Sequence, residues 1–436
     1  MRRNIIQIDE IALLLKEVQT DLLRCARCGM CQGVCPVFYE TRSETDVTRG
    51  KLVLLEGLIE KMFDNPEGVL KRLNRCLLCG SCALNCPNGV KAVEIFFKAR
   101  LILSSVLGLS MLKRNILKKI LANPDAFNRT IQLGIKFQKW AIKPESKILN
   151  TSSLRFSSHI LADRHFVRLS PVPFHLRQSS IEKKSGSNGI KVLFFVGCLI
   201  DNIFPNVGEA VLKALNYHNM EVIIPEKQAC CGIPMLSSGD AGSFEQLMQH
   251  NLKLFEEKNF DFIVSACATC TYTLKKIWPM MVQNKNNNIK SAVTRLSQKV
   301  QDISEFLVSK KEVARIPADF SNERRIITYH DPCHLKKSLN IYDEPRSIIT
   351  ANPEFKLVEM AGADQCCGMG VTFNLEHYDL SCDIGKRKVE NIKAANCEVV
   401  ATGCPACMIH LSDILSKSGL NISVKHPVEI YAEKWN

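Results

Sequence analysis

The second half of the chain alternates short apolar runs with longer stretches of helical periodicity, and it does so twice. In the first copy, apolar residues recur at helical spacing over 206–218 and 243–258. The strand-like runs of the first copy are 191–197, 221–225 and 260–266, and those of the second are 325–330, 355–360 and 397–403. Strands that alternate with helices form parallel sheets. The pattern therefore predicts two repeated α/β units with parallel strands.

The first hundred residues have helical periodicity instead. Apolar residues recur at helical spacing over 47–63 and 67–75, and residues 1–19 form an amphipathic pattern. That opening segment has acids among its apolar positions and no small-residue cleavage site, so it is not predicted to be a signal peptide. No apolar run reaches the roughly 18 residues that span a bilayer. The nearest, 101–112, is flanked by lysine and arginine.

Composition marks the boundaries between these regions. Residues 170–189 are rich in Pro, Ser and Gly, which is typical of a linker, and 283–288 is a polar run. The predicted segments are a helical domain at 1–100, a basic helical region and linker at 101–190, the first α/β unit at 191–283, a connecting helical segment at 284–324, and the second α/β unit at 325–436.

Cysteine is the anomaly in the composition, with 20 among 436 residues. A chain without a secretion signal keeps its thiols reduced, so clustered cysteines indicate metal rather than disulfides. Eight of them form two runs of C-x2-C-x2-C-x3-C-P at a constant offset of 51, namely Cys25, Cys28, Cys31, Cys35, Cys76, Cys79, Cys82 and Cys86. This is the spacing of bacterial ferredoxins. Zinc, the alternative metal, favours two C-x2-C pairs instead.

The assignment of these eight ligands follows from the ferredoxin pattern. In two-cluster ferredoxins the fourth cysteine of each run ligates the other cluster. We therefore expect one [4Fe–4S] cluster on Cys25, Cys28, Cys31 and Cys86, and a second on Cys76, Cys79, Cys82 and Cys35. Backbone N–H groups around Gly29 and Gly80 are expected to hydrogen-bond the sulfurs. Because the sequence between the runs is helix-like, the predicted domain is an α-helical ferredoxin, similar to the C-terminal half of fumarate reductase iron–sulfur subunits.

Ten further cysteines follow the predicted strands of the α/β units. They are Cys198, Cys230, Cys231, Cys267 and Cys270 in the first unit, and Cys333, Cys366, Cys367, Cys404 and Cys407 in the second. Ligands bind beyond the carboxyl ends of parallel strands, so three loops of each unit are expected to converge on one site. His330 and His334 flank Cys333, and we expect them to hydrogen-bond near the sulfurs or to belong to the turn, with a ligand role as the alternative. Cys382 and Cys397 fall outside both repeats and are predicted to be plain buried thiols.

The two α/β units resemble the cysteine-rich CCG domain. The resemblance rests on GCLIDN and YHDPCHL at the first cysteines, CCGIP and CCGMG at the double cysteines, and ACATC and GCPAC at the last pairs. CCG domains occur in subunits of heterodisulfide reductase and of anaerobic glycerol-3-phosphate dehydrogenase, and in the glycolate oxidase iron–sulfur subunit. A ferredoxin domain followed by two CCG units resembles the glycolate oxidase subunit most.

The resemblance also implies cofactors for the CCG units. In the heterodisulfide reductase relatives each five-cysteine set binds a non-cubane [4Fe–4S] cluster, and all five positions are present in both units here. Other CCG relatives hold an ordinary cluster or zinc. One iron–sulfur cluster per unit is therefore the expectation, with zinc in one unit as an open alternative.

By this resemblance the chain is the iron–sulfur electron-transfer subunit of a flavin-dependent glycolate or lactate dehydrogenase. It would relay single electrons from an FAD-linked oxidase subunit to a quinone or another acceptor, and it is expected to be inactive alone. No residue is assigned a catalytic role. The alternatives are a heterodisulfide reductase-like subunit that cleaves a disulfide at the CCG clusters, and the iron–sulfur subunit of anaerobic glycerol-3-phosphate dehydrogenase.

The lack of nucleotide-binding motifs and the positive net charge indicate what kinds of partner the chain needs. The sequence has no G-x-G-x-x-G between a strand and a helix and no G-x4-G-K-[ST], so a flavin or nicotinamide is expected on another subunit. The formal net charge of +13 suits an acidic partner or an anionic membrane surface. No nucleic-acid-binding motif is present, and no nucleic-acid partner is expected. The expected location is cytoplasmic, with peripheral contact to the cytoplasmic membrane face as an alternative.

Overall fold

The computed structural model describes residues 8–155, 163–177, 189–310, 313 and 324–433. The chain divides into two compact units, each assembled from segments that are distant in sequence. The first unit comprises 1–123, 232–249 and 366–385, and the second comprises 124–231, 250–365 and 386–436. The ferredoxin-like runs lie in the first unit and the two parallel sheets lie in the second.

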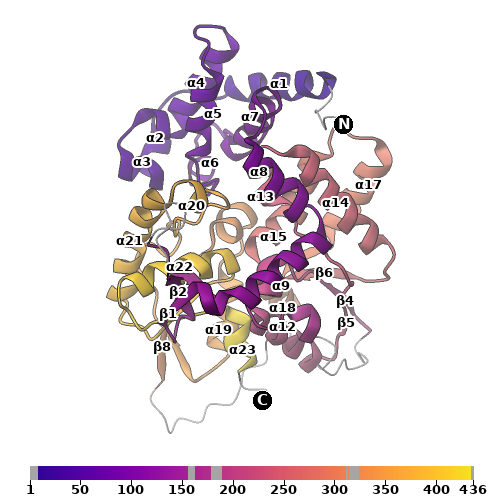
Figure 1. The fold of residues 1–436 in the computed structure, drawn as a ribbon, viewed down its shortest axis with the longest axis vertical. Helices are drawn as coiled ribbons and strands as arrows, with labels where there is room; N and C mark the ends of the chain where they lie inside the picture. Colours follow the sequence, from indigo (N-terminus) through magenta and orange to yellow (C-terminus); the bar gives the residue numbers. More distant parts are fainter. Residues whose placement is uncertain (1–7, 156–162, 178–188, 311–312, 314–323, 434–436) are drawn as a thin grey trace. The chain divides into compact units, whose positions relative to one another are not determined.

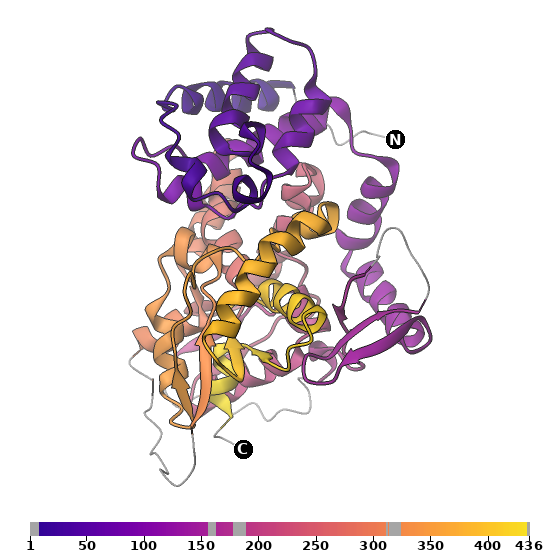
Figure 2. The ribbon, with the colours of Figure 1, turned by 90° about the vertical axis from the view of Figure 1, so that its left-hand side faces the viewer.

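The first unit is helical, as the periodicity predicts. Its N-terminal elements are α1 (Ile8–Leu22), α2 (Met30–Gly33), α3 (Pro36–Thr41), α4 (Thr48–Ile59), α5 (Pro66–Asn74), α6 (Ser81–Leu84), α7 (Ala92–Leu107) and α8 (Met111–Asn115). Helix α7 packs against α1 and α5 and buries Phe96, Phe97 and Leu101. These helices run from indigo to purple in Figure 2. A helix that is apolar on most sides belongs in a core, and α7 is the core helix of this unit.

Two segments from the α/β half of the sequence complete the first unit. Helix α13 (Ile233–Ser237) contacts α7, and α20 (Phe373–Glu376) follows the second double cysteine. Helices α14 (Ala241–Glu256) and α21 (Tyr378–Ala394) begin in this unit. Gly239, with φ +84°, permits the close approach to α7, because a Cβ at this position would lie 2.1 Å from the Ser104 hydroxyl oxygen.

The second unit contains two four-stranded sheets of equivalent topology, parts of which are labelled in Figure 1. The first has the order β5-β4-β6-β7 and consists of β4 (Lys191–Phe194), β5 (Glu221–Ile223), β6 (Phe262–Ser265) and β7 (Val300–Asp302). The second has the order β9-β8-β10-β11 and consists of β8 (Arg325–Tyr329), β9 (Phe355–Leu357), β10 (Val399–Ala401) and β11 (Ser423–Lys425). Every neighbouring pair is parallel. The prediction of two repeated α/β units is confirmed.

Helices connect these strands within the second unit. They include α11 (Cys198–Asn202), α12 (Pro205–Tyr217), α15 (Ala268–Tyr272), α16 (Trp278–Met281), α19 (Asp343–Thr350), α22 (Pro405–Lys417) and α23 (Pro427–Ala432). The connection expected to be helical at 284–324 contains α17 (Asn287–Gln298) and α18 (Ile303–Ser309), but β7 lies between them. The sequence did not predict β7 (VQD) or β11 (SVK), because each has a single apolar residue and so lacks the apolar run that marked the other strands.

Residues 124–177 combine a long helix with a small antiparallel sheet. Helix α9 (Pro124–Ala141) leads into β1 (Ile142–Ser146), β2 (Thr151–Leu154) and β3 (Phe166–Val167), which pair in that order, and α10 (Phe174–Arg177) follows. The sequence predicted only helices and a linker here, and 178–188 of that linker lies outside the described residues. Domain boundaries remain a prediction.

No helix among the described residues is by itself long and apolar enough to cross a bilayer. Helix α7 and the stretch from Met111 to Leu121 meet the length and composition criteria only as a pair, with a bend of 110° between them.

Candidate iron–sulfur sites

The two ferredoxin-like runs share an unusual backbone conformation. Arg27 (φ 55°) and Leu78 (φ 54°) occupy equivalent positions of the two runs in the left-handed region, and Gly29 (φ 85°) and Gly80 (φ 75°) follow two residues later. Each glycine is the N-cap of a four-residue helix, α2 or α6. Repeated left-handed residues curl the chain tightly, and glycine tolerates this conformation best. The curl lets one short loop present three thiols to one cavity.

One cavity of the first unit is lined by Cys25, Cys28 and Cys31 of the first run and by Cys86 of the second. Cys82, which also lines the second cavity described below, lines this cavity as well. Arg49 lies on its wall and donates a hydrogen bond to the Arg27 carbonyl oxygen at 3.1 Å. Cys28 is exposed, so this cavity is the more open to solvent at its ligands. The structure thus brings together the four cysteines that the sequence assigned to the first cluster.

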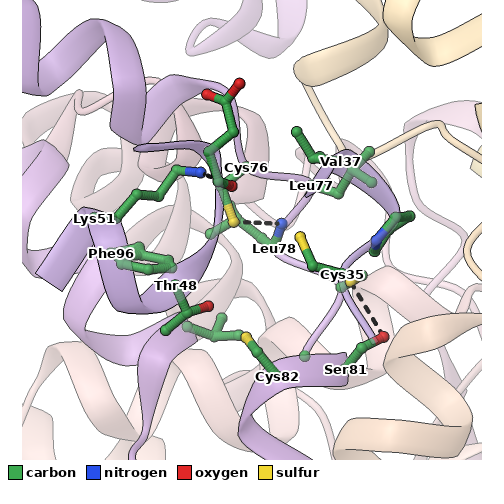
Figure 3. Close-up of a pocket in the computed structure, with 15 residues that line it drawn as sticks. Cys35, Val37, Thr48, Lys51, Cys76, Leu77, Leu78, Ser81, Cys82 and Phe96 are labelled. Carbon is green, nitrogen blue, oxygen red and sulfur yellow. Dashed lines mark hydrogen bonds between the residues drawn. The ribbon is translucent and has the colours of Figure 1, made fainter. Parts of the chain in front are cut away.

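A second cavity is lined by Cys35 of the first run and by Cys76, Cys79 and Cys82 of the second. Figure 3 shows the sulfur-bearing side chains of Cys35, Cys76 and Cys82 around it. Backbone N–H groups donate to two of these sulfurs, from Leu78 to Cys76 and from Phe38 to Cys35, both at 3.4 Å. Hydrogen bonds of this kind tune the potential of an iron–sulfur centre.

Buried cations accompany the second cavity. Lys51 lines it with only 1% of its surface exposed, and its ammonium donates to the Asp46 carbonyl oxygen. The Asp46 carboxylate, also buried, pairs with Arg72 at 3.3 Å and Arg75 at 3.2 Å. Because a buried charge is costly without a counter-charge, a thiolate-bound centre next to Lys51 would offset the cost.

Arg100 is the second buried cation near this cavity, at 2% exposure on helix α7. Its guanidinium donates to the carbonyl oxygens of Leu73 at 2.6 Å and Cys76 at 3.0 Å. A third bond, at 3.0 Å, reaches the carbonyl oxygen of Ser237 on α13. Burial lowers the pKa of Arg100, and the nearby Cys76 opposes that shift. Arg100 therefore joins a loop of the second cavity to the segment that follows the first double cysteine.

The donor set of both cavities fits [4Fe–4S] clusters. Four cysteines line the second cavity, and five line the first, of which Cys82 lines both; each cavity therefore has the four thiols that a cubane cluster takes from cysteine. Burial raises the pKa of the Cys35 thiol to about 12 and also raises the pKa of Cys31 and Cys82. Such thiols stay protonated at neutral pH unless a metal takes the place of the proton.

The five cysteines of the first CCG-like unit converge at the carboxyl ends of its strands. Cys198 follows β4, and its thiol hydrogen-bonds that of Cys230 at 3.9 Å. Hydrogen bonds with Cys231 and then Cys267 raise the pKa of the Cys270 thiol. Three loops thus deliver one five-thiol group, as the sequence predicts. The Cys231 carbonyl oxygen accepts a hydrogen bond from the buried Trp278 indole at 3.1 Å, which holds this loop.

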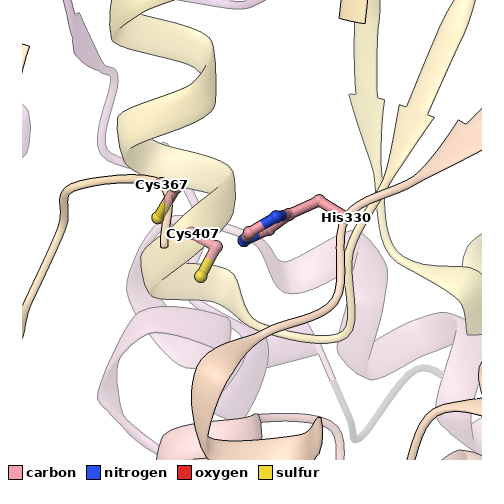
Figure 4. Close-up of side chains that lie close together, drawn as sticks. All are labelled: His330, Cys367 and Cys407. Atoms are coloured by element: carbon pink, nitrogen blue, oxygen red, sulfur yellow. The ribbon is translucent and has the colours of Figure 1, made fainter. Parts of the chain in front are cut away.

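In the second CCG-like unit, Cys333 follows strand β8, and Cys404 and Cys407 follow strand β10. Cys366 and Cys367 belong to the segment 366–385 of the first compact unit. His330 and Cys407 offer ligand atoms within 4.8 Å of each other. Figure 4 draws this pair together with Cys367. All three side chains are buried.

His330 is fixed in an orientation that suits a ligand. Its Nδ1 lies 3.1 Å from the Ala363 carbonyl oxygen, to which it can only donate. Its Nε2 is buried and has no hydrogen-bond partner among the described residues. Buried polar atoms are rarely left unpaired, and a histidine held by one nitrogen typically binds metal through the other. The geometry therefore favours the ligand role, which the sequence held as the less favoured alternative.

His334 has a different environment. Its ring stacks on Tyr272 at a centroid distance of 4.7 Å, and its Nδ1 lies 3.1 Å from the Thr269 hydroxyl. Thr269 in turn lies 3.6 Å from the Cys404 sulfur. His334 is therefore part of the hydrogen-bonded surroundings of the sulfurs, which was one of the two roles expected for it.

The two CCG-like sites adjoin each other through their C-x-x-C motifs. The Ala268 N–H donates to the Gly403 carbonyl oxygen at 3.0 Å, which pairs the chain after Cys267 with the chain before Cys404. Hydrogen bonding to Cys267 is the largest cause that lowers the pKa of Cys404. The thiols of Cys267 and Cys404, which belong to different CCG-like repeats, are thus in direct contact inside the second compact unit. Outside these sites, Cys397 is buried as predicted, whereas Cys382 is only half-buried.

Comparison with protein families separates the same three cysteine-bearing regions, one ferredoxin-like and two CCG-like. Residues 21–90 match the model of the 4Fe-4S dicluster domain, and residues 192–275 and 327–412 each match the cysteine-rich CCG domain. Each match covers one of the cysteine-bearing regions described above.

Individual relatives extend the likeness along the chain. An uncharacterized iron–sulfur protein of Methanococcus maripaludis is 35% identical over 92% of this chain and 69% of its own length. A probable glycolate oxidase iron-sulfur subunit of Bacillus subtilis is 27% identical over 93% of this chain and 91% of its own length. One component of the fumarate reductase (CoM/CoB) of Methanothermobacter marburgensis is 35% identical over 59% of this chain, which spans about half of that protein, 49%.

Lys51 and Arg100 are the residues near the sites that sequence reasoning missed. Both lie within helices whose neighbouring positions are apolar, in KLVLL and KARLIL. Cations inside an apolar helical stretch were the available signal. This signal does not reveal burial by itself, because long cationic side chains often extend to the surface.

Proposed function

Because the chain belongs to the family of iron–sulfur proteins that join a 4Fe-4S dicluster domain to two CCG domains, we propose that it is the electron-relay subunit of a flavin-dependent 2-hydroxy acid dehydrogenase. The relative named for glycolate oxidase supports glycolate as the substrate, and a lactate utilization protein A of Exiguobacterium, 28% identical over 56% of this chain, supports lactate. In this proposal the chain receives electrons from an FAD-linked oxidase subunit and delivers them to a quinone or another acceptor.

The observation that best supports a relay lies inside the first unit. A Cβ on Gly370, three residues after Cys367, would lie 3.0 Å from the Leu77 backbone, and Leu77 directly follows Cys76. Arg100 makes the second link, from the Cys76 carbonyl oxygen to that of Ser237, six residues after Cys231. The segments after both double cysteines therefore pack against the loop of the second ferredoxin cavity. These contacts link the chain that follows each double cysteine to the loop of the second ferredoxin cavity, which supports electron transfer between the two kinds of site.

The protein's own residues would hold the centres and set their surroundings. Iron–sulfur clusters, when bound, accept and release single electrons. Eight cysteine thiolates of the two ferredoxin-like runs would hold two [4Fe–4S] clusters, and each five-cysteine set would hold one more. Lys51 and Arg100 supply buried positive charge beside the second cavity, which offsets negative charge that reduction adds there.

Metal content tests the cofactor part of the proposal. Protein prepared without oxygen should contain about sixteen irons, at four irons per cluster. Iron near eight with stoichiometric zinc would mean that the two CCG units are not both iron–sulfur sites. Elemental analysis combined with electron paramagnetic resonance of the reduced protein separates these outcomes.

Dependence on a flavoprotein tests the relay itself. The isolated chain should not be reduced by glycolate or lactate, and it should become reducible when its flavoprotein subunit is added. If surface charge guides assembly, transfer should weaken with salt, since the Debye length falls to about 3 Å at 1 M. Stopped-flow mixing that follows cluster bleaching measures both effects. Rapid bleaching by a hydroxy acid without added flavoprotein would refute the relay.

A second function is favoured by one observation. The thiols of Cys267 and Cys404 are in contact, so the two CCG sites are adjacent and could act together on one disulfide. The likeness to a component of a fumarate reductase (CoM/CoB) points the same way. Reduction of a heterodisulfide by the chain and an artificial donor, without a flavoprotein, would support this alternative over the relay.

A further inference from the structure

Side chains from 138–155, 168–177 and 203–206 line a cavity of about 410 Å³ within the second unit, and none of the lining residues is a cysteine. It lies between helix α9, strands β1 and β2, and the start of helix α12, all of which are labelled in Figure 1. A volume of this size is in the range of small-molecule sites, roughly 300–1,000 Å³. No motif marks 138–177, which lies between the matched regions 21–90 and 192–275, while the lining residues at 203–206 lie inside the first CCG match.

The cavity is strongly basic. Lys139, Arg155, Arg168 and Arg177 line it, and none of the described residues that line it is Asp or Glu. Of the four cations, only Arg177 has a carboxylate partner among the described residues, Glu209 at 2.8 Å. The other three cations line one cavity and have no carboxylate partner among the described residues. Their like charges repel one another unless a bound anion neutralises them.

Two buried polar atoms at the cavity also indicate that a ligand binds there. The Nε of Arg168 is shielded from solvent and has no hydrogen-bond partner among the described residues. Ser152, which is fully buried in β2 and also lines the cavity, has a hydroxyl oxygen that no described residue hydrogen-bonds. Buried polar groups are almost always satisfied, so their presence beside a basic hollow indicates a polar ligand.

We propose that this cavity binds a phosphate-bearing anion, with Arg155, Arg168 and Lys139 as its cationic contacts. A phosphate group carries about −1.5 to −2 charge and three strong acceptor oxygens at neutral pH. It therefore matches three cations that share one hollow better than a single carboxylate does. Arginine forks bind phosphate oxygens in pairs, which explains the choice of Arg over Lys at two of the three positions.

The phosphate has two sources, a free phosphate ester or a lipid headgroup. Exposed apolar side chains stand next in sequence to the lining residues, with Phe137 63% and Trp140 69% exposed beside Lys139. Aromatic and basic residues of this kind are typical of segments that contact anionic bilayers. The test therefore includes both sources. The proposal stands apart from the electron relay and does not require it.

Binding by the full, cluster-loaded chain tests the site. Titration calorimetry with pyrophosphate, and co-sedimentation with phosphatidylcholine vesicles with and without phosphatidylglycerol, cover the free and lipid sources. Arg168→Gln should weaken binding at least about tenfold, since a hydrogen bond to a charged group is worth about 1.5–3 kcal/mol and tenfold is about 1.4 kcal/mol. Lys139→Gln, at an exposed position of α9 that tolerates substitution, should weaken binding in the same direction.

Lys136→Gln, on α9 but outside the cavity lining, is the matched control and should leave binding unchanged. The visible spectrum of the clusters checks that each variant folds. Binding of pyrophosphate that both lining variants weaken supports a free ester, and binding only of phosphatidylglycerol vesicles with the same mutant pattern supports a headgroup. The proposal is overturned if neither probe binds, if both lining variants bind like the control, or if citrate binds and the phosphate probes do not.

Discussion

Replacement of Arg100 by methionine should destabilise the first unit more than the same replacement at an exposed arginine does. The guanidinium makes three hydrogen bonds, at 2.6, 3.0 and 3.0 Å, that hold together α7, the Cys76 loop and α13. Methionine fills much of the same volume but removes the donor to three carbonyl oxygens, of which those of Ser237 and Leu73 are buried and that of Cys76 is partly buried. The change therefore isolates the polar link from the packing of α7.

The size of the effect follows from these bonds. A hydrogen bond to a charged group contributes about 1.5–3 kcal/mol, but neighbouring bonds are not additive, and single substitutions rarely cost more than about 4–5 kcal/mol. We expect a loss of about 3–5 kcal/mol in the free energy of unfolding. Loss of the buried cation should also lower the reduction potential of the second ferredoxin cluster. At an effective dielectric near 20, an interaction of about 1–2 kcal/mol corresponds to on the order of 40–90 mV for one electron.

Urea unfolding of anaerobically prepared protein measures the stability, and a redox titration followed by electron paramagnetic resonance measures the potential. Arg114→Met, at an exposed position of α8, is the control and should change neither quantity. Arg100→Lys should keep most of the potential while losing part of the stability, because lysine retains the charge but not the fork. If Arg100→Met unfolds within about 1 kcal/mol of the unchanged protein, well below the cost of even one such bond, the three-bond link does not stabilise this unit.

Four further outcomes are expected. Cys28→Ser should remove one ferredoxin cluster and about four irons while the CCG signals remain, and simultaneous loss of all clusters would mean that the sites assemble cooperatively. Gly370→Ala should slow reduction of the CCG centres without changing the ferredoxin signals, because the new Cβ would lie 2.5 Å from a Leu77 methyl group; equal rates in a stopped-flow comparison would contradict this. His330→Gln should alter only the spectrum assigned to the second CCG centre if Nε2 is a ligand, and an unchanged spectrum would return His330 to a structural role. Burial raises the pKa of Asp302 to about 7. The folded state then holds a proton that the unfolded chain releases from about pH 4, so stability should fall by about 1.4 kcal/mol per pH unit up to about pH 7. Asp302→Asn should flatten that fall in thermal unfolding between about pH 5 and 8, and a parallel slope in the variant would assign the fall to other groups.

The structure brings together cysteines that the sequence grouped, because their placement depends on local rules. A parallel sheet brings the carboxyl ends of its strands to one edge, so the cysteines after β4 and β6 had to approach each other. The C-x2-C-x2-C-x3-C spacing similarly fixes how one loop presents three thiols. The repeat offset alone was enough to recognise both duplications.

Other features depend on contacts that leave no local pattern. Nothing in 232–249 or 366–385 indicates that these segments join the helical unit, because their apolar residues look like those of any core helix. Lys51 is buried because α4 packs beside Asp46, and the hydrophobic periodicity of the sequence does not predict that contact. The strands β1 to β3 are short and partly polar, so they resembled a linker.

The discontinuous make-up of the first unit has a consequence for synthesis on the ribosome. Its N-terminal segment ends at Asn123, but the segment that completes it begins only at Cys366. At about 5–20 residues per second, the intervening chain takes on the order of 10–50 s to be made. The surface of α7 that receives α13 is uncovered until 232–249 is made, about halfway through that interval, and the surface of the Cys76 loop that receives Gly370 is uncovered for all of it. Release of the nascent chain before Cys366 leaves the helical unit permanently unfinished, although every cysteine of its two ferredoxin-like runs has already been translated.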